Sequence, residues 1–230
     1  MMESPAPSAA HVSSRTAAAL LVFTLVFTGL MAATYNATRP LLEASAQAEK
    51  MKLINEVLPP GQYDNDLLAD FIALPPQPAL GLDAESRLYR ARKGSEPVAL
   101  VLEAAAPDGY SGRINLVLAV RADGRLAAVR VTGHKETPGL GDYIDPKKDK
   151  QGRKRGRPWI GQFNDTSLDA EAVGPWKVKK DGGRFDYMTG ATISARAVAN
   201  ASGKALAWAV ERRERLFAPP AGGKFKEETP

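Results

Sequence analysis

The feature that most constrains this chain is an uncharged segment near its N-terminus. About 23 residues separate Arg15 from Arg39, and the centre of this segment, residues 17–33, is almost wholly apolar. Because a helix of about 20 apolar residues crosses the hydrocarbon core of a bilayer, the segment predicts one transmembrane helix. Tyr35 lies where an aromatic residue would meet the membrane interface. The rest of the chain is therefore expected to fold beside a membrane.

A cleaved secretory signal is the alternative interpretation of this segment. Arg15 precedes the apolar run, and the small residues Ala32 and Ala33 would suit a cleavage site. The run is longer than the usual apolar region of a signal peptide, which favours an uncleaved anchor. Basic residues flank the segment on both sides, so the bias in local charge is small and leaves its orientation open.

The amino-acid composition indicates a globular protein and narrows its chemistry. Of the 230 residues, 44% are hydrophobic and 25% are charged, which is typical of a folded domain with a core. The chain contains no cysteine and only two histidines, His11 and His134. This excludes disulfides, thiolate metal ligands, iron–sulfur ligation and a catalytic thiol, and no metal site is expected. Any redox chemistry must come from an organic cofactor.

Helix and strand patterns follow the apolar segment. Helical spacing over residues 41–58 ends at Pro59-Pro60-Gly61, and residues 63–78 are expected to lack regular structure because of their prolines. A tight hairpin is predicted at Asp123-Gly124. The predicted strands, which form an antiparallel sheet, cover residues 87–90, 98–104, 113–121 and 126–132.

A long C-terminal helix completes the predicted fold. Apolar residues recur at helical spacing from about Ile193 to Phe217, and they form the stripe Val198, Ala201, Ala205, Trp208 and Ala209. One face of the sheet should pack on this stripe, which gives an α+β domain. We expect four parts: a tail and transmembrane anchor at 1–39, a helical and turn-rich connecting region at 40–95, the α+β domain at 96–217 and a flexible tail at 218–230.

The segment 186–192, of sequence DYMTGAT, lies directly before this helix. The first N–H groups of a helix have no partner within it, and the helix dipole leaves partial positive charge there, so a phosphate group fits at this end. Thr189 and Thr192 place hydroxyls beside these donors, while Gly190 and Ala191 leave room for a ligand. An ordinary threonine cap after a glycine turn is the other interpretation.

The sequence around this motif resembles a known family of flavoproteins. Residues 178–198 closely resemble the flavin-attachment region of the G subunit of the Rnf electron-transport complex, also called RsxG. Residues 132–142 and 103–112 resemble further signatures of that family. The resemblance implies that FMN is joined through a phosphoester bond to the last Thr of the motif, which is Thr192 by position. It also implies a separate flavin transferase that recognises a pattern including Asp186.

The resemblance further implies a location and a set of partners. The expected location is the cytoplasmic (inner) membrane, with a single span and the FMN-binding domain on the periplasmic side. The expected partners are membrane lipid and the other subunits of the Rnf complex, which couples electron flow between NADH and ferredoxin to sodium or proton translocation. The chain would act as a subunit of this oxidoreductase, with no catalytic residue of its own and little activity alone. A C-type subunit of the sodium-translocating NADH:quinone reductase, which shares the attachment motif, is the alternative within the flavin class.

Further residues are candidates for contacts with the flavin. Lys179 and Lys180 place positive charge near the motif, where they could balance a phosphate or a reduced flavin, or serve only solubility. His134 could hydrogen-bond the flavin or be a structural histidine. The remaining candidates belong to a turn whose backbone N–H groups could approach a ring or phosphate: Glu136, Thr137, Gly139, Leu140 and Gly141.

Residues 147–157 form a strongly basic loop. Seven lysines and arginines stand against one acid, Asp149, which gives a local net charge of +6 in a chain whose total is +5. The loop could bind anionic lipid or an acidic partner, or be a solvated loop with glycine joints. Nucleic acid is not expected as a partner, because no interleaved aromatic residues or reading motif accompany the cluster. A non-redox, membrane-anchored binding or assembly module that uses this loop is the competing function.

Overall fold

The structure is a computed structural model that describes residues 9–154, 156–168 and 175–226. The chain forms two compact units, and the boundary between them in the sequence lies between Lys50 and Met51. Helix α1 (Ala9–Val57) provides the first unit and the first residues of the second, and it continues through Pro40. The helix predicted over residues 41–58 is therefore the C-terminal part of α1.

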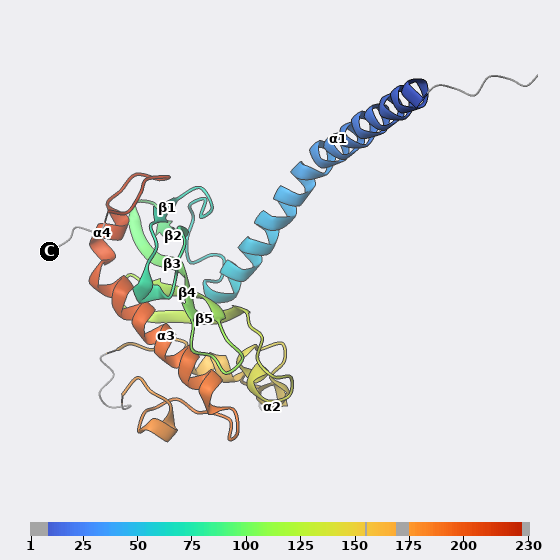
Figure 1. Cartoon of the computed structure of the whole chain (residues 1–230). Helices are drawn as coiled ribbons and strands as arrows, with labels where there is room; N and C mark the ends of the chain where they lie inside the picture. The colour runs from blue at the N-terminus through green and yellow to red at the C-terminus, as the bar shows by residue number, and fades with distance from the viewer. Residues whose placement is uncertain (1–8, 155, 169–174, 227–230) are drawn as a thin grey trace, which may run out of the picture. The chain divides into compact units, whose positions relative to one another are not determined.

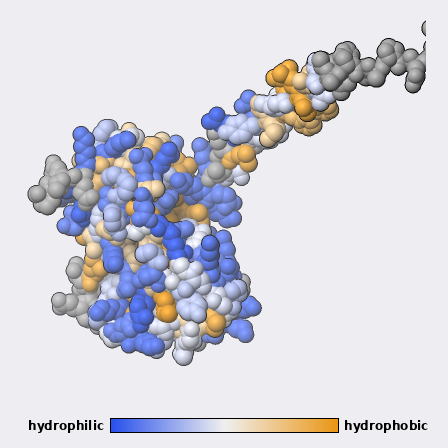
Figure 2. Space-filling model, viewed as in Figure 1, coloured by the Kyte–Doolittle hydropathy of each residue, from blue (hydrophilic) through white to orange (hydrophobic). Residues whose placement is uncertain are grey.

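One part of α1 is long and apolar enough to cross a membrane. This span, Ser13–Pro40, has a mean hydropathy of 2.1, and its large apolar side chains are exposed. Figure 2 shows apolar residues along this helix, whereas the visible face of the globular unit is mainly hydrophilic. The span is consistent with the membrane anchor that the sequence predicts.

The globular unit contains one five-stranded antiparallel sheet in the order β1-β2-β3-β4-β5 (Figure 1). The strands are β1 (Phe71–Leu74), β2 (Ser86–Lys93), β3 (Glu96–Ala106), β4 (Ile114–Arg121) and β5 (Leu126–Gly133). Strands β2 to β5 confirm the four predicted strands. The expectation of no regular structure over residues 63–78 is wrong at β1, because pairing of its backbone with residues 86–89 of β2 forms a strand that a local pattern does not reveal. Strands β1 and β2 lie in the region that the sequence analysis assigned to a connecting segment.

One face of the sheet packs against helix α3 (Thr192–Glu211). Leu102 and Leu118 belong to the apolar cluster on this face, together with the whole predicted stripe of α3. The predicted packing of helix on sheet is therefore confirmed, and the domain is α+β. The helical segment expected to reach Phe217 is divided, because α3 ends at Glu211 and a short helix α4 (Arg213–Phe217) follows.

The opposite face of the sheet is covered by the end of α1. Ile54 and Val57 form a second apolar cluster with alternate strand residues, among them Val101 and Val117. The sequence pattern predicted packing on one face only. Both faces are covered, so the central strands are buried on both sides, and the chain enters the globular unit on the face opposite α3.

Short helices lie in the connections of the globular unit. They are η1 (Pro78–Leu80), η2 (Gly141–Ile144), α2 (Lys150–Lys154), η3 (Trp159–Phe163) and η5 (Lys179–Asp181). Of these, η2 packs against α3, and η3 packs against β5. They bring the loops after β5 to the N-terminal end of α3.

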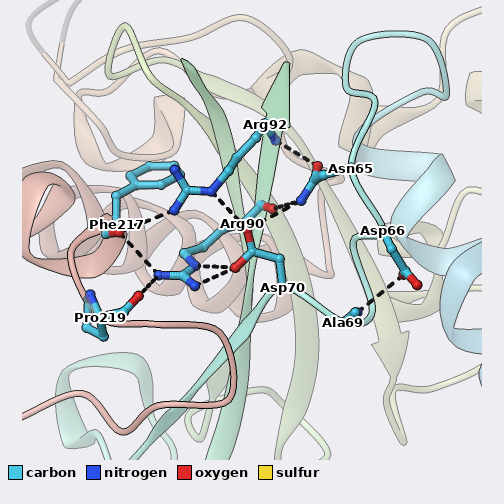
Figure 3. A network of polar contacts seen from close by, with 8 residues as sticks. All are labelled: Asn65, Asp66, Ala69, Asp70, Arg90, Arg92, Phe217 and Pro219. Atoms are coloured by element: carbon cyan, nitrogen blue, oxygen red, sulfur yellow. Dashed lines mark hydrogen bonds and ion pairs between the residues drawn. The ribbon is translucent and has the colours of Figure 1, made fainter. Parts of the chain in front are cut away.

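A buried arginine fastens the C-terminal segment to the sheet (Figure 3). Arg90 of β2 is 1% exposed, and its guanidinium donates to the carboxylate of Asp70 and to the carbonyl groups of Phe217 and Pro219. Arg92 donates to the same carboxylate at 2.8 Å and to the Phe217 carbonyl at 3.2 Å. Beyond this network, Phe225 is buried, and its N–H donates to the carbonyl of Ala73 in β1 at 2.9 Å. Residues 218–226 are thus held along the edge of the sheet.

Candidate functional site

The predicted motif ends at the first residue of the long helix. Helix α3 begins at Thr192, and the preceding cap position is occupied by Ala191, whose side chain cannot accept a hydrogen bond. No side chain of the described residues caps this end of the helix. The first N–H groups of a 20-residue helix therefore lack the usual acceptor and remain available to an anion. The ordinary threonine cap is wrong as an interpretation, because Thr192 lies one residue beyond the cap position.

The loop before Thr192 has a backbone that glycine makes possible. Gly190 has a φ of +88°, a left-handed conformation that other residues rarely adopt. The positive φ therefore favours glycine here. A Cβ at this position would meet nothing within 4 Å, so the space beside Gly190 is open. Thr192 is 9% exposed, whereas Thr189 lies at the surface. This loop presents both threonine residues of the motif near one helix end.

Tyr143 of η2 holds this loop in place. Its hydroxyl accepts a hydrogen bond from the N–H of Met188 at 3.1 Å and donates to the carbonyl of Ala191 at 3.4 Å. Burial raises the pKa of Tyr143 to about 12, against the lowering effect of the Met188 N–H. The phenol is therefore protonated at neutral pH and keeps both roles. Tyr143 is not among the site residues predicted from the sequence, because nothing local to residue 143 signals contact with residues 188–191.

Glu136 joins the three regions that carry the family resemblance. It is 4% exposed, and its carboxylate accepts hydrogen bonds from the N–H of Ser111 at 3.1 Å and the hydroxyl of Ser194 at 2.6 Å. A Cβ on Gly141 would lie 2.6 Å from both Glu136 Oε2 and Ser194 Oγ, so only glycine fits beside this pair. Glu136 and Gly141 therefore have protein neighbours, and these contacts connect residues 132–142 to the first turn of α3.

His134 presents a free donor in the same region. Its Nδ1 accepts a hydrogen bond from the N–H of Glu136 at 3.1 Å, which leaves the proton of a neutral ring on Nε2. This Nε2 atom is buried and has no hydrogen-bond partner in the described part of the chain. A buried donor without an acceptor is costly, so this atom suits a polar group of a ligand.

The other turn candidates lie at the surface between His134 and Tyr143. Thr137 is half-buried and its carbonyl accepts from the N–H of Leu140, while the N–H of Gly139 donates to the carboxylate of Asp142 at 2.9 Å. Leu140 is 49% exposed, and Ile193, which directly follows Thr192, is 43% exposed. Because η2 packs on α3, two exposed apolar side chains lie in the region of the helix start.

Lys179 and Asp186 form an ion pair with each other. The Lys179 ammonium therefore has a carboxylate partner in this structure, and both side chains are largely exposed. The backbone of Asp186 is held on both sides: its N–H donates to Gln162 Oε1 at 2.7 Å, and its carbonyl accepts from Trp159 Nε1 at 2.7 Å. Lys180 is exposed and lies in the same helix η5.

A cleft of about 990 Å³ opens beside Thr189. Its walls include the aromatic side chains of Tyr143, Trp159 and Tyr187, and two basic residues, Arg157 and Arg184, also line it. Its volume lies near the upper end of the range of small-molecule sites, roughly 300–1,000 Å³. Thr189 precedes Thr192 by three residues, so the cleft begins within about 10 Å of chain from the helix start. An uncapped helix end suits a phosphate group, and an aromatic cleft beside it suits a planar ring.

Comparison with known proteins agrees with this geometry. Residues 109–207 match the model of the FMN-binding domain family, and residues 3–57 match that of the RnfG N-terminal region. The first match includes the region of Glu136, the cleft and the start of α3. The chain is thus an FMN-binding domain protein with an N-terminal apolar helix.

Curated relatives define the family more closely. The chain is 43% identical over 205 residues to the G subunit of the ion-translocating oxidoreductase complex of Pseudomonas aeruginosa, an alignment that covers 89% of this chain and 92% of the relative. It is 40% identical over 198 residues to the G subunit of that complex from Pseudoalteromonas atlantica, with 86% and 88% covered, and 37% identical over 201 residues to that from Vibrio cholerae, with 87% and 92% covered. The chain belongs to the RnfG family, the G subunits of ion-translocating oxidoreductase complexes, which confirms the resemblance inferred from its motifs.

Proposed function

We propose that this chain is the FMN-carrying, membrane-anchored subunit of an ion-translocating oxidoreductase complex, and that it relays electrons between NADH and ferredoxin through FMN attached to Thr192. The observation that supports this most directly is the uncapped N-terminus of α3 with Thr192 as its first residue. Its relatives are named as subunits of an ion-translocating oxidoreductase complex, and membership of that family supports the same assembly for this chain.

The phosphate end of the cofactor would be held at the helix start. The free N–H groups of the first turn of α3 would donate to phosphate oxygens, and the helix dipole would favour their negative charge. Attachment would require a flavin transferase that uses FAD. Thr192 Oγ1 would lose its proton and replace AMP on the phosphorus of the FMN moiety, so that AMP would be released. The exposed Asp186 belongs to the pattern proposed for recognition by that enzyme.

The flavin ring would lie in the cleft beside Thr189. Tyr143, Trp159 and Tyr187 would pack on a planar aromatic ring, and Arg157 or Arg184 would favour a reduced ring that carries negative charge. His134 Nε2–H and the exposed side chain of Leu140 are further candidates for contacts. When bound, FMN supplies the electron-transfer chemistry that no side chain of this chain provides.

The proposed location follows from the apolar helix. A single span at Ser13–Pro40 would hold the protein in the cytoplasmic membrane, with the FMN-binding domain on the periplasmic side. Tethering beside membrane-bound partners gives the flavin a high effective concentration. A covalent bond would prevent its loss in a compartment without free flavin.

Expression with a flavin transferase tests the attachment. After denaturing electrophoresis the natural chain should fluoresce under ultraviolet light, because only a covalent flavin survives denaturation. Thr192→Val should lose all fluorescence, whereas the matched variant Thr189→Val, three residues away on the same loop, should keep it. Fluorescence that persists in Thr192→Val would show that another residue carries the flavin.

A further inference from the structure

The basic loop of residues 147–157 lies at the rim of the flavin cleft. Gln151, Gly152 and Arg157 line the cleft together with Thr189. Helix α2 occupies the centre of the loop, and η3 follows directly after it with the cleft residue Trp159. The loop and the proposed flavin site are therefore parts of one surface.

Asp149, the single acid of the loop, forms hydrogen bonds that fix the fold of the loop. Asp149 is 2% exposed, and its carboxylate accepts hydrogen bonds from the N–H of Gly152 and from the N–H of Trp159, both at 2.7 Å. These bonds fold the loop back toward the start of η3. Because both oxygens are buried and bonded, Asp149 fixes the loop and does not form surface ion pairs with its lysines.

Five cations of the loop have described side chains, and all five are exposed. They are Lys147, Lys148, Lys150, Lys154 and Arg157. Within the described ranges none of them forms an ion pair, although other lysines and arginines of the same ranges do. The loop carries +6, whereas the remainder of the chain sums to −1. Positive charge is thus concentrated at one edge of the cleft.

We infer that this loop is a docking surface for a carboxylate-rich face of another protein subunit, which it brings to the mouth of the flavin cleft. This inference rests on the proposed function, because a subunit that exchanges electrons with the flavin must approach the cleft. Complementary charge at the rim raises the rate of encounter and fixes orientation. A protein is favoured over lipid because the loop borders the cleft proposed for the flavin, which an electron-exchanging subunit must reach.

Zero-length cross-linking in native membranes tests the inference. A carbodiimide joins a lysine amine to a touching carboxylate as an amide, and the reagent takes up the water that is lost. We expect amide links from Lys147, Lys148 or Lys150 to Asp or Glu residues of another subunit of the complex, identified by mass spectrometry of the linked peptides. The yield should fall as salt concentration rises.

Two sets of variants make the result decisive. Lys147→Glu with Lys148→Glu and Lys150→Glu should lower co-purification of the linked subunit at least about tenfold, whereas the matched reversal of the exposed Lys93, Lys204 and Lys226 should leave it unchanged. Lysine-to-arginine changes at the three loop positions should remove these links but keep co-purification. In-gel flavin fluorescence, measured in parallel, reports whether the flavin is attached. If the partner subunit is still linked to the loop but the chain carries no flavin, the proposed function is wrong and the docking surface stands.

Three outcomes would overturn the inference. The first is an intact, flavin-loaded complex that gives no link from the loop. The second is equal co-purification of the loop variant and the matched control. The third is a loop variant that keeps the partner subunit but, in detergent, no longer binds phosphatidylglycerol that the natural chain binds, which would assign the loop to lipid.

Discussion

Two hydroxyl groups lie at the start of α3 in very different surroundings. That of Tyr143 is buried and bonded to backbone groups of Met188 and Ala191. That of Thr192 has no hydrogen bond within the part of the chain that the structure describes, and it belongs to the first residue of an uncapped helix. The first hydroxyl is therefore suited to hold the loop, and the second is free to form a bond with a ligand.

Tyr143→Phe should destabilise the globular unit by about 1–3 kcal/mol, because the N–H of Met188 loses its acceptor in a buried setting. The variant should also change the response to alkali. Since the pKa of Tyr143 rises from 10.0 to about 12 on folding, its contribution to stability is complete below pH 10 and is lost as the pH rises toward 12.

Urea unfolding of the full chain in detergent at pH 8 and pH 11 measures both effects. The natural chain should lose more stability between these pH values than Tyr143→Phe does. Tyr110→Phe is the matched control, because Tyr110 is 67% exposed and should show neither effect. Equal stability of Tyr143→Phe and the natural chain would disprove the anchoring role.

Among the secondary-structure elements, three loops come together at the N-terminal end of α3. Glu136 bonds to the loop between β3 and β4 through Ser111 and to α3 through Ser194. Tyr143 and Asp149 add links from the loops after β5. The sheet supports this arrangement through the packing of α3 on β3 and β4.

Glu136→Ala should cost about 1–3 kcal/mol of stability, since the buried hydroxyl of Ser194 and the N–H of Ser111 lose their acceptor. Glu96→Ala changes an exposed glutamate and is expected to have little effect. Thermal unfolding followed by circular dichroism compares the two. If Glu136→Ala unfolds at the temperature of the natural chain yet binds no flavin, Glu136 serves the cofactor and not the fold.

Local patterns predicted the elements better than the contacts between them. The stripe from Val198 to Ala209 and the alternation along β4 are visible in short windows, so α3 and four strands could be predicted from sequence. Strand β1, the burial of Val117 and the roles of Tyr143 and Arg90 depend on residues far away in the chain, which no local period reveals. The proposal of Thr192 as the attachment site comes from the resemblance of its motif to a family, whereas its place at the helix start was predictable because the motif adjoins a helical pattern.

At the scale of the whole molecule, an apolar span and a globular unit follow each other in the chain. Helix α1 contains the span Ser13–Pro40, and its last residues complete the core of the globular unit through Ile54 and Val57. The C-terminal segment closes the other end of the unit, where Arg90 and Arg92 bind the carbonyl groups at Phe217 and Pro219 (Figure 3). Both ends of the globular unit are therefore tied to its sheet.

Arg90→Met should destabilise the globular unit by about 3–5 kcal/mol, because it removes a buried cation whose charge is paired with the carboxylate of Asp70. Hydrogen exchange should rise most at residues 218–226, whose backbone lies along β1. Arg87→Met, on the same strand but exposed, is the matched control. Unchanged exchange at residues 218–226 would show that the network does not hold the segment.

Tandem mass spectrometry of the natively produced protein tests whether Thr192 carries FMN. Trypsin releases residues 185–196 as one peptide, which contains both Thr189 and Thr192. We expect this peptide to carry the mass of FMN less one water, and we expect its fragment ions to assign the addition to Thr192. An unmodified peptide, or one modified at Thr189, would contradict this assignment.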